Sequence, residues 1–164
     1  MQKALYMTKN QLKQKYCLQS SKQIGKYAIL KTIGHGATCK VKMAFDLDTG
    51  QRVAMKVMNE DIEEKVLFEE INAMSQVDHQ NVLKLIDYGY GEYQKKDKPS
   101  RNVFFIVLEY AGVGDLFDLI AHSGGFSEEL TRYYFKQFLE ALQYCHERGI
   151  AHRDIKIENV LLLD

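Results

Sequence analysis

The spacing of apolar residues changes near residue 60, from the period of a strand to that of a helix. Before that point, three segments read as strands, 27–33, 41–45 and 52–58, and in 41–45 the residues alternate in the period of a half-buried strand. The cluster of turn-forming residues at 46–50 separates the last two segments. Short turns between successive strands predict an antiparallel meander.

Segment 61–77 carries its apolar residues at about 100° per residue, which predicts a helix. The apolar arc consists of Val66, Leu67, Ile71, Ala73, Met74 and Val77. One acidic residue, Glu70, lies near the middle of that arc. Two further apolar runs, 82–89 and 103–110, predict two more strands, and the polar, basic loop between them, 92–101, contains the only proline. We interpret this loop as a solvated hairpin tip.

Two helices are predicted in the rest of the chain. The first is short, at 114–121, and the second begins at Ser127, a good N-cap followed by two glutamates in the first turn. Gly149 is placed to end the second helix. Its apolar stripe consists of Leu130, Tyr134, Phe138, Leu142 and Cys145. The final apolar run, 160–163, reads as a strand without a partner strand in the sequence.

Five strands with one inserted helix, followed by helices, predict an α+β fold with two lobes. Residues 1–23 are polar and rich in Lys and Gln, so we expect a largely mobile N-terminal arm, with a short helix as the alternative interpretation. The folded domain is expected over 24–164. No internal repeat and no low-complexity linker interrupts it.

Composition and charge narrow the function classes. The chain has 164 residues, of which 46% are hydrophobic and 27% charged, as in soluble globular proteins. Basic and acidic residues number 22 each, so no net charge draws the chain to nucleic acid or membranes. The three cysteines form no CxxC pair, and the chain shows no signal peptide and no apolar run of membrane-spanning length. We therefore expect a cytoplasmic or nuclear protein that binds neither nucleic acid nor membranes.

A glycine-rich turn is predicted between the first two strands. Gly34 and Gly36 let the backbone turn tightly and approach a phosphate closely, although an ordinary glycine turn accounts for them equally well. In a dinucleotide-binding fingerprint the glycines open a helix, whereas here they lead into a strand, which disfavours a nicotinamide-binding protein. A Walker phosphate loop is absent, because no Gly-Lys-Ser/Thr follows.

Lys56 and Glu70 form a candidate ion pair. Lys56 lies on the third predicted strand, which the hairpin brings beside the glycine turn. By itself it could be a surface lysine. A carboxylate on an apolar helix face is costly to bury without a partner, and Lys56 is the natural partner for Glu70. Glu63 has a similar bearing, but it lies at the start of the helix and can stay hydrated.

The loop after the long helix carries the strongest local signal. Within 152–159 it places Asp154, Lys156 and Asn159, which are a base, a cation and an amide that can bind a metal. A charged turn at a helix end is the alternative interpretation.

Taken together, these motifs resemble the eukaryotic protein kinase superfamily over 27–164. They occur in the family's order, and chance does not reproduce them all in register. The motifs are Gly34-x-Gly36-x-x-Cys39-x-Val41, Val53-Ala-Met-Lys56, Glu70, Val107-Leu-Glu109-Tyr-Ala111 and His152-Arg-Asp154. The stretch 108–118 resembles the calmodulin-dependent and AMP-activated kinase group, and Lys156 matches the serine/threonine pattern.

The resemblance implies a role for each matching residue. Four residues would cover ATP: Ile33, Gly34, Gly36 and Val41. Ala54 would line the adenine pocket, with Leu108 as gatekeeper behind it. Glu109 and Ala111 would form the hinge, and Asp115 would lie near the ribose. Lys56, paired with Glu70, would hold the α and β phosphates. Asp154 would accept the proton of the substrate hydroxyl, Lys156 would steady the transferring phosphoryl group, and Asn159 would bind Mg²⁺.

The resemblance also implies a division into lobes and a class of partner. It places an N-lobe at 24–108, a hinge at 109–113 and the start of a C-lobe at 114–164, and it implies a protein substrate with serine or threonine. The oligomeric state is left open.

Three departures from the family pattern matter. Cys39 replaces the third glycine, where we expect an inert, buried thiol rather than a redox-active one, and Ile157 replaces a common proline. The chain stops at Asp164, before any Asp-Phe-Gly motif, so we expect a truncated catalytic domain without activity of its own. The alternative is an inactive module that binds nucleotide or a partner.

Overall fold

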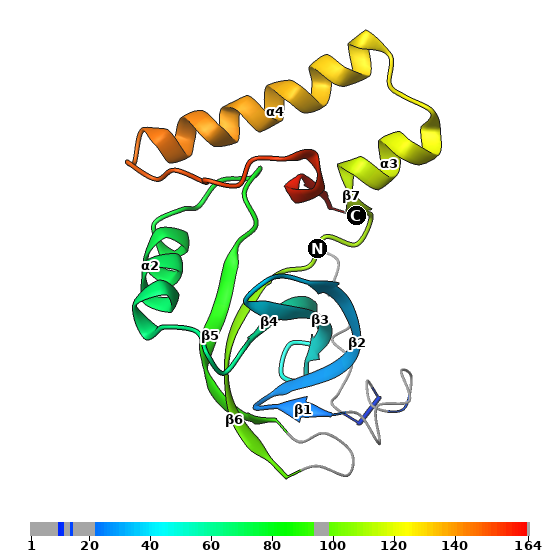
Figure 1. The fold of residues 1–164 in the computed structure, drawn as a ribbon. Coiled ribbons are helices and arrows are strands. Elements are labelled where there is room, and N and C mark those ends of the chain that lie inside the picture. Colours follow the sequence, from blue (N-terminus) through cyan, green and yellow to red (C-terminus); the bar gives the residue numbers. More distant parts are fainter. Residues whose placement is uncertain (1–9, 12–13, 15–21, 94–98, 164) are drawn as a thin grey trace, which may run out of the picture. The chain divides into compact units, whose positions relative to one another are not determined.

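The structure is a computed structural model that describes residues 10–11, 14, 22–93 and 99–163 (Figure 1). Most of the predicted N-terminal arm and half of the basic loop at 92–101 lie outside the described residues. The elements are β1 (Gln23–Ile24), β2 (Tyr27–His35), β3 (Cys39–Asp46), β4 (Arg52–Met58), α2 (Glu64–Ser75), β5 (Leu85–Tyr93), β6 (Arg101–Glu109), β7 (Gly114–Asp115), α3 (Leu116–Ser123), α4 (Glu128–His146), the 3-10 turn η2 (Ile157–Asn159) and β8 (Leu161–Leu162).

The chain divides into two compact units. The first comprises Met1–Glu64 and Leu85–Glu109, and so holds the main sheet. The second comprises Lys65–Lys84 and Tyr110–Asp164, and so holds nearly all of α2 together with the later helices.

The main sheet is antiparallel, with strand order β1-β2-β3-β4-β6-β5. All five predicted strands are therefore confirmed. At the hairpin end, β5 and β6 extend beyond the predicted segments, because their ladder continues through the pairs Glu92–Asn102 and Tyr93–Arg101. Strands β2 and β3 are also longer than predicted. The short strand β1 is an addition, since its two residues are too few to show a period.

Alternating side chains of the strands build the core of the first unit. On β4, Val53, Met55 and Val57 are buried, whereas Ala54 and Lys56 are half-buried on the opposite face. The core cluster combines apolar side chains from every strand of the sheet: Ile24, Tyr27, Ile29, Ala44, Val53, Met55, Val57, Tyr93, Val103, Phe105 and Val107. A strand with one buried face is fixed in register, because a slip of one residue would expose this set.

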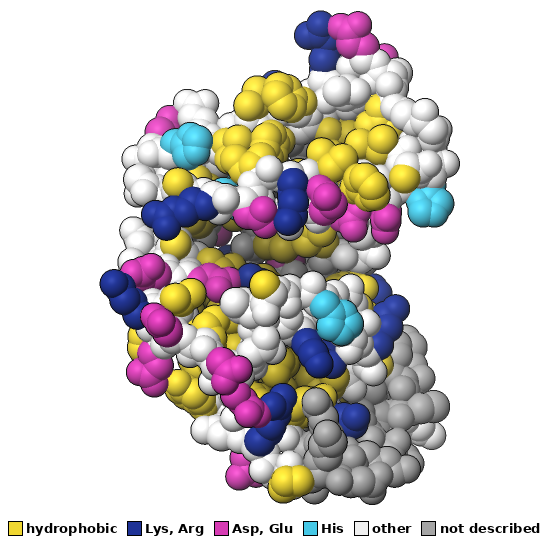
Figure 2. Space-filling view, in the orientation of Figure 1, with side chains coloured by type: hydrophobic (Ala, Val, Ile, Leu, Met, Phe, Trp, Pro, Cys, Tyr) yellow, Lys and Arg dark blue, Asp and Glu magenta, His cyan; other side chains and the backbone are white. Residues whose placement is uncertain are grey.

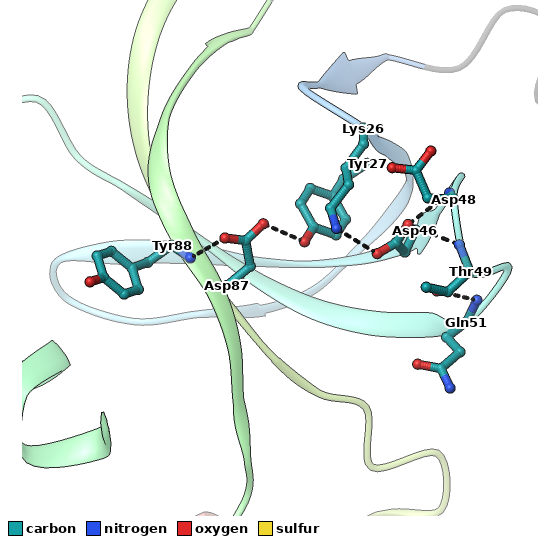
Figure 3. Close-up of polar contacts among 8 residues, drawn as sticks. All are labelled: Lys26, Tyr27, Asp46, Asp48, Thr49, Gln51, Asp87 and Tyr88. Carbon is teal, nitrogen blue, oxygen red and sulfur yellow. Dashed lines mark hydrogen bonds and ion pairs between the residues drawn. The ribbon is translucent and has the colours of Figure 1, made fainter. Parts of the chain in front are cut away.

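The sheet curls so that β1 packs against β5. Gly91 allows this approach, since a methyl group at its Cβ position would lie 2.8 Å from Cγ2 of Ile24 and 3.2 Å from Cε1 of Phe105. The Tyr27 hydroxyl crosses the same region and donates to Oδ2 of Asp87 at 2.7 Å (Figure 3). Burial and this hydrogen bond both raise the pKa of Tyr27.

A buried carboxylate fixes the turn between β3 and β4. Asp46 is 3% exposed, and its Oδ1 accepts the N–H groups of Asp48 at 2.8 Å and Thr49 at 3.2 Å (Figure 3). Its Oδ2 lies 3.0 Å from Nζ of Lys26. This hydrogen bond raises the pKa of Lys26.

Helix α4 begins as the sequence predicts. Ser127 is its N-cap and accepts the N–H of Leu130 at 3.2 Å, while Gly149 takes the left-handed conformation with φ of 70°. Only Ala141 is buried within the helix. The predicted stripe is half-buried at Tyr134, Phe138, Leu142 and Cys145, and the exposed large apolar side chains of α4 are Leu130, Tyr133, Phe135 and Leu139. Figure 2 shows apolar side chains gathered over α3 and α4.

The prediction that 160–163 is a strand without a partner is wrong. Leu161–Leu162 forms β8 and pairs with β7, through Gly114–Leu162 and Asp115–Leu161. The backbone bonds on either side, from Val113 N to Leu162 O and from Leu116 N to Val160 O, extend the contact. The partner was missed because β7 is two residues long and carries no apolar alternation.

Candidate functional site

The glycine turn joins β2 to β3. The N–H of Gly36 donates to the carbonyl of Cys39 at 2.9 Å, which closes the turn around the exposed residues Ala37 and Thr38. Cys39 itself is 7% exposed. A Cβ at Gly36 would lie 3.3 Å from Sγ of Cys39, so the absence of a side chain at Gly36 leaves space for this thiol.

The strand ladder brings several predicted nucleotide-binding residues onto one face of the sheet. Gly34 pairs with Val41, and Val41 pairs with Lys56. Ala54 lies two residues before Lys56 and pairs with Leu108. Directly paired residues, and residues two apart on a strand, share one face. Val41, Ala54, Lys56 and Leu108 therefore share the face of β4 opposite its buried side chains.

Of the remaining predicted nucleotide-binding residues, Ile33 and Glu109 belong to the first unit, and Ala111 and Asp115 belong to the second. Ile33 is exposed at 41% near the end of β2. Glu109 ends β6 and pairs with Val53, and Ala111 follows in a segment without regular structure. Asp115 caps α3, where its Oδ1 accepts the N–H of Asp118 at 2.7 Å, so a role near a ribose stays a prediction.

The predicted pair of Lys56 and Glu70 spans the two units. Lys56 lies on β4 in the first unit, and Glu70 is half-buried on α2 in the second. Leu67 and Ile71 are the buried residues of α2, whereas Val66 of the predicted apolar arc is 46% exposed. The predicted arc is therefore confirmed only in part. The pairing itself stays a prediction.

The loop after α4 brings together the three residues singled out in its sequence. Nδ2 of Asn159 donates to the backbone carbonyl of Asp154 at 2.7 Å and to its Oδ2 at 2.9 Å. Nζ of Lys156 lies 3.1 Å from the same Oδ2. Asn159 is the last residue of the 3-10 turn η2, which positions its side chain for these contacts. The backbone N–H of Asn159 donates to the carbonyl of Lys156 at 3.0 Å.

These contacts favour the ionised form of Asp154. The hydrogen bond from Asn159 lowers the pKa of Asp154 most, the Lys156 ammonium lowers it further, and the charge of His152 adds to the shift. The loop is also strained, because Arg153 has φ of 65°, a left-handed conformation that is unusual for a residue with a side chain. Strain of this kind occurs where the surrounding structure fixes a functional geometry.

The geometry is compatible with a Mg²⁺ ligand at Asn159. Its amide nitrogen makes both contacts to Asp154, so its side-chain oxygen takes part in neither of them. Oxygen ligands are those that Mg²⁺ prefers. Within the described residues, no cluster of three or more His, Cys, Asp or Glu side chains is placed to hold a metal. No helix in that part of the chain is long and apolar enough to span a membrane.

Sequence reasoning missed Asn59, which lies just after β4. Its backbone N–H donates to the carbonyl of Thr38 at 2.9 Å, and its Nδ2 donates to the carbonyl of Ala37 at 3.2 Å. Both acceptors belong to the tip of the glycine turn. No motif marks this asparagine; only the β3–β4 register brings it there.

Known proteins are similar in sequence to most of this chain. The family model of the protein kinase domain matches residues 27–164. CBL-interacting serine/threonine-protein kinase 26 of Arabidopsis thaliana is 40% identical over 149 residues, covering 86% of this chain and 31% of the relative. CBL-interacting protein kinase 11 of Oryza sativa subsp. japonica is 42% identical over 144 residues, covering 85% and 27%. The chain thus spans about a third of the length of such relatives.

A solved structure supports the same assignment. The crystal structure of Rad53 residues 1–466 in complex with AMP-PNP matches with a TM-score of 0.71 and 28% identity, over 85% of this chain and 35% of that one. It shares the antiparallel sheet and the helices that follow. The CBL-interacting relatives also agree with the predicted calmodulin-dependent and AMP-activated kinase group. The chain therefore belongs to the protein kinase domain family.

Proposed function

We propose that this chain carries the nucleotide-binding sheet and the catalytic loop of an ATP-dependent serine/threonine protein kinase. The observation that carries the proposal is the Asp154 carboxylate, held by Asn159 and Lys156 within one loop. A carboxylate kept ionised at neutral pH can accept a proton from a hydroxyl group.

In the proposed reaction, the γ-phosphoryl group of ATP passes to a serine or threonine hydroxyl of a protein. The bond from the γ-phosphorus to the bridging oxygen breaks, and a bond to the hydroxyl oxygen forms. Asp154 accepts the hydroxyl proton, and ADP leaves with the bridging oxygen. Lys156 offers positive charge beside Asp154 for the transferring group.

The sheet face of the first unit is proposed to bind the nucleotide. Val41, Ala54 and Leu108 supply apolar contact for a base, and Lys56 supplies a cation for phosphate oxygens. Gly34 and Gly36 allow close approach of the turn, with Ile33 beside it. Asn159 would be one of the residues that hold Mg²⁺, and the ion would supply positive charge to offset that of the phosphates.

The remaining assignments rest on the family alone. We propose that Glu70 pairs with Lys56, that Glu109 and Ala111 bind the base through their backbone, and that Asp115 lies near the ribose. The proposed partner is a protein substrate, and the proposed location is the cytoplasm or the nucleus.

Replacing Lys56 tests the function. In the natural protein that contains these residues, Lys56→Met should reduce transfer to a protein substrate by at least about a hundredfold, because one phosphate-neutralising cation is lost. Lys40→Met is the matched control, since Lys40 is an exposed lysine on β3, and it should retain activity. Turnover of Lys56→Met close to that of the parent would contradict the role of Lys56.

Two further readouts separate the alternatives. Phosphoamino-acid analysis of the product should show phosphoserine or phosphothreonine, and a predominance of phosphotyrosine would contradict the substrate class. Binding of AMP-PNP without any transfer in the natural protein would instead support an inactive nucleotide-binding module.

A further inference from the structure

The tip of the glycine turn is tethered by a residue outside the kinase motifs. Asn59 donates two hydrogen bonds to successive carbonyls of the tip, from its backbone to Thr38 and from its side chain to Ala37. A turn whose two tip residues, Ala37 and Thr38, are exposed would otherwise move easily. Two bonds to adjacent peptide units fix both its position and its tilt.

The two hydrogen bonds from Asn59 determine the direction in which the backbone N–H groups of the tip point. In a trans peptide unit, the carbonyl of one residue and the N–H of the next point in opposite directions. Because the carbonyl of Ala37 points toward Asn59, the N–H of Thr38 points away from it. An N–H that faces outward from a glycine-rich turn is a donor available to an anionic oxygen.

The same strand carries the tether and the proposed phosphate-binding cation. Asn59 follows Lys56 by three residues, and Lys56 is paired with Val41 on the strand that leaves the turn. On the other side, Glu60 forms an ion pair with Arg101 at the start of β6. Asn59 therefore links the tip to the strand of Lys56 just beyond Cys39–Met58, the last pair of the β3–β4 ladder.

We propose that Asn59 is a positioning residue that holds the glycine turn ready for the phosphates of a nucleoside triphosphate. The inference rests on the proposed function and deepens it. It assigns the side-chain amide of Asn59 to phosphate affinity alone, because the amide contacts the tip and no residue of the face proposed for the base.

The test compares a nucleotide with its nucleoside. Affinities of AMP-PNP and of adenosine are measured by NMR titration for the parent chain and for Asn59→Asp, which keeps the size and the backbone bond but replaces the Nδ2 donor by an oxygen. AMP-PNP affinity should fall about three- to tenfold, as expected for loss of one hydrogen bond, and adenosine affinity should be unchanged. Asn59→Ala should show the same selective loss.

The matched control is Asn102→Asp, because Asn102 is an exposed asparagine of β6 away from the turn. It should change neither affinity. Equal losses for AMP-PNP and adenosine in Asn59→Asp, or no loss for either, would overturn the role of Asn59. If the parent chain binds neither ligand, the proposed function fails together with this inference. If the parent chain binds AMP-PNP and Asn59→Asp binds it equally well, only this inference fails.

Discussion

At the residue scale, the surroundings of Asp154 set its chemistry. Its Oδ2 faces both Nδ2 of Asn159 and Nζ of Lys156, although the side chain is 64% exposed. Exposed ion pairs contribute little to stability. The contacts therefore matter for orientation and ionisation rather than for holding the fold.

Removing the Asn159 amide should raise the pKa of Asp154 toward its ordinary value. The hydrogen bond from Asn159 is the largest single cause of the lowered pKa, and Lys156 lowers the pKa through both a hydrogen bond and its charge, so Asn159→Ala and Lys156→Met should each raise it. Because the pKa is lowered in the folded loop, ionised Asp154 contributes to the stability of that loop at every pH above its ordinary pKa. This contribution to stability is lost as the pH falls through the folded-state pKa. Carboxyl ¹³C NMR titration would measure the shift.

Glu158→Gln is the matched control for that titration, because Glu158 is exposed in the same 3-10 turn. It should leave the pKa of Asp154 nearly unchanged. An Asp154 pKa that is the same in Asn159→Ala as in the parent would show that Asn159 does not favour its ionised form.

Single residues also show where sequence reasoning stops. Asp154, Lys156 and Asn159 could be predicted to act together, because all three lie within six residues of one loop. Asn59 could not, since it is separated from Ala37 by 22 positions and meets the turn only through strand pairing. A common polar residue after a strand carries no signal of its own.

At the element scale, closure of the sheet depends on Gly91. Gly91→Ala would place a methyl group 2.8 Å from Ile24, whose side chain is fully buried. Overpacking of this kind costs about 1–3 kcal/mol, so we expect a comparable loss in the free energy of unfolding measured with urea. Glu92→Ala, on the exposed side of the same strand, should cost less than about 0.5 kcal/mol. Equal stability of the two variants would show that β1 does not need this glycine.

The segment between α2 and β5 is attached to α4. The Tyr144 hydroxyl accepts the N–H of Asp78 at 3.2 Å, and its ring lies 4.8 Å from that of His79. Nδ2 of Asn81 donates to the carbonyl of Gln137 at 3.2 Å, and the Arg148 guanidinium stacks 3.5 Å from the Tyr144 ring. Within the second unit, Tyr144 thus connects the segment that follows α2 to helix α4.

Tyr144→Phe should loosen this attachment without breaking the helix. The variant keeps the ring contacts and loses one hydrogen bond of about 1 kcal/mol, so exchange of the Asp78 amide should become about fivefold faster in hydrogen-exchange NMR. Tyr133→Phe is the control, because Tyr133 is 62% exposed on the same helix, and it should leave the Asp78 rate unchanged. A Tyr144→Phe rate equal to the parent rate would show that the hydroxyl does not hold the segment.

The elements themselves were largely predictable, because each long one carries a clear period or cap. Residues 41–45 alternate in the strand period, and Ser127 with its two glutamates marks the start of α4. The two-residue strands β1, β7 and β8 are too short to show a period. Their pairing depends on where distant segments meet, which is why 160–163 was wrongly left without a partner.

At the scale of the whole molecule, burial is divided unevenly between the two units. The first unit contains the core cluster of the sheet. The buried apolar side chains of the second unit are Leu67, Ile71, Leu116 and Ala141. Apolar burial contributes about 25 cal/mol per Å², and a domain is stable by only about 5–15 kcal/mol in total. The second unit therefore has much less apolar burial to offset the entropy of folding.

We expect the second unit of this chain to unfold before the first. Amides of β4 and β6 should exchange with solvent at least about a hundredfold more slowly than those of α4, because the strands enclose the core and α4 buries only Ala141. The exposed face of α4 should bind a fluorescent dye for apolar surfaces, since Phe135 is 55% and Leu139 47% exposed. Hydrogen-exchange mass spectrometry and dye fluorescence measure the two effects on the same sample.

Polar substitution on α4 locates the dye-binding surface. Phe135→Gln combined with Leu139→Gln should lower dye fluorescence by about half or more, because it removes two large side chains from the exposed face, and should leave exchange in β4 and β6 unchanged. Tyr90→Gln is the matched control, since Tyr90 is 59% exposed but lies on β5 in the first unit, and it should have a small effect. Slow exchange in α4, with weak dye binding by the parent chain, would mean that its apolar face is covered in solution. The two units would then form one cooperative structure.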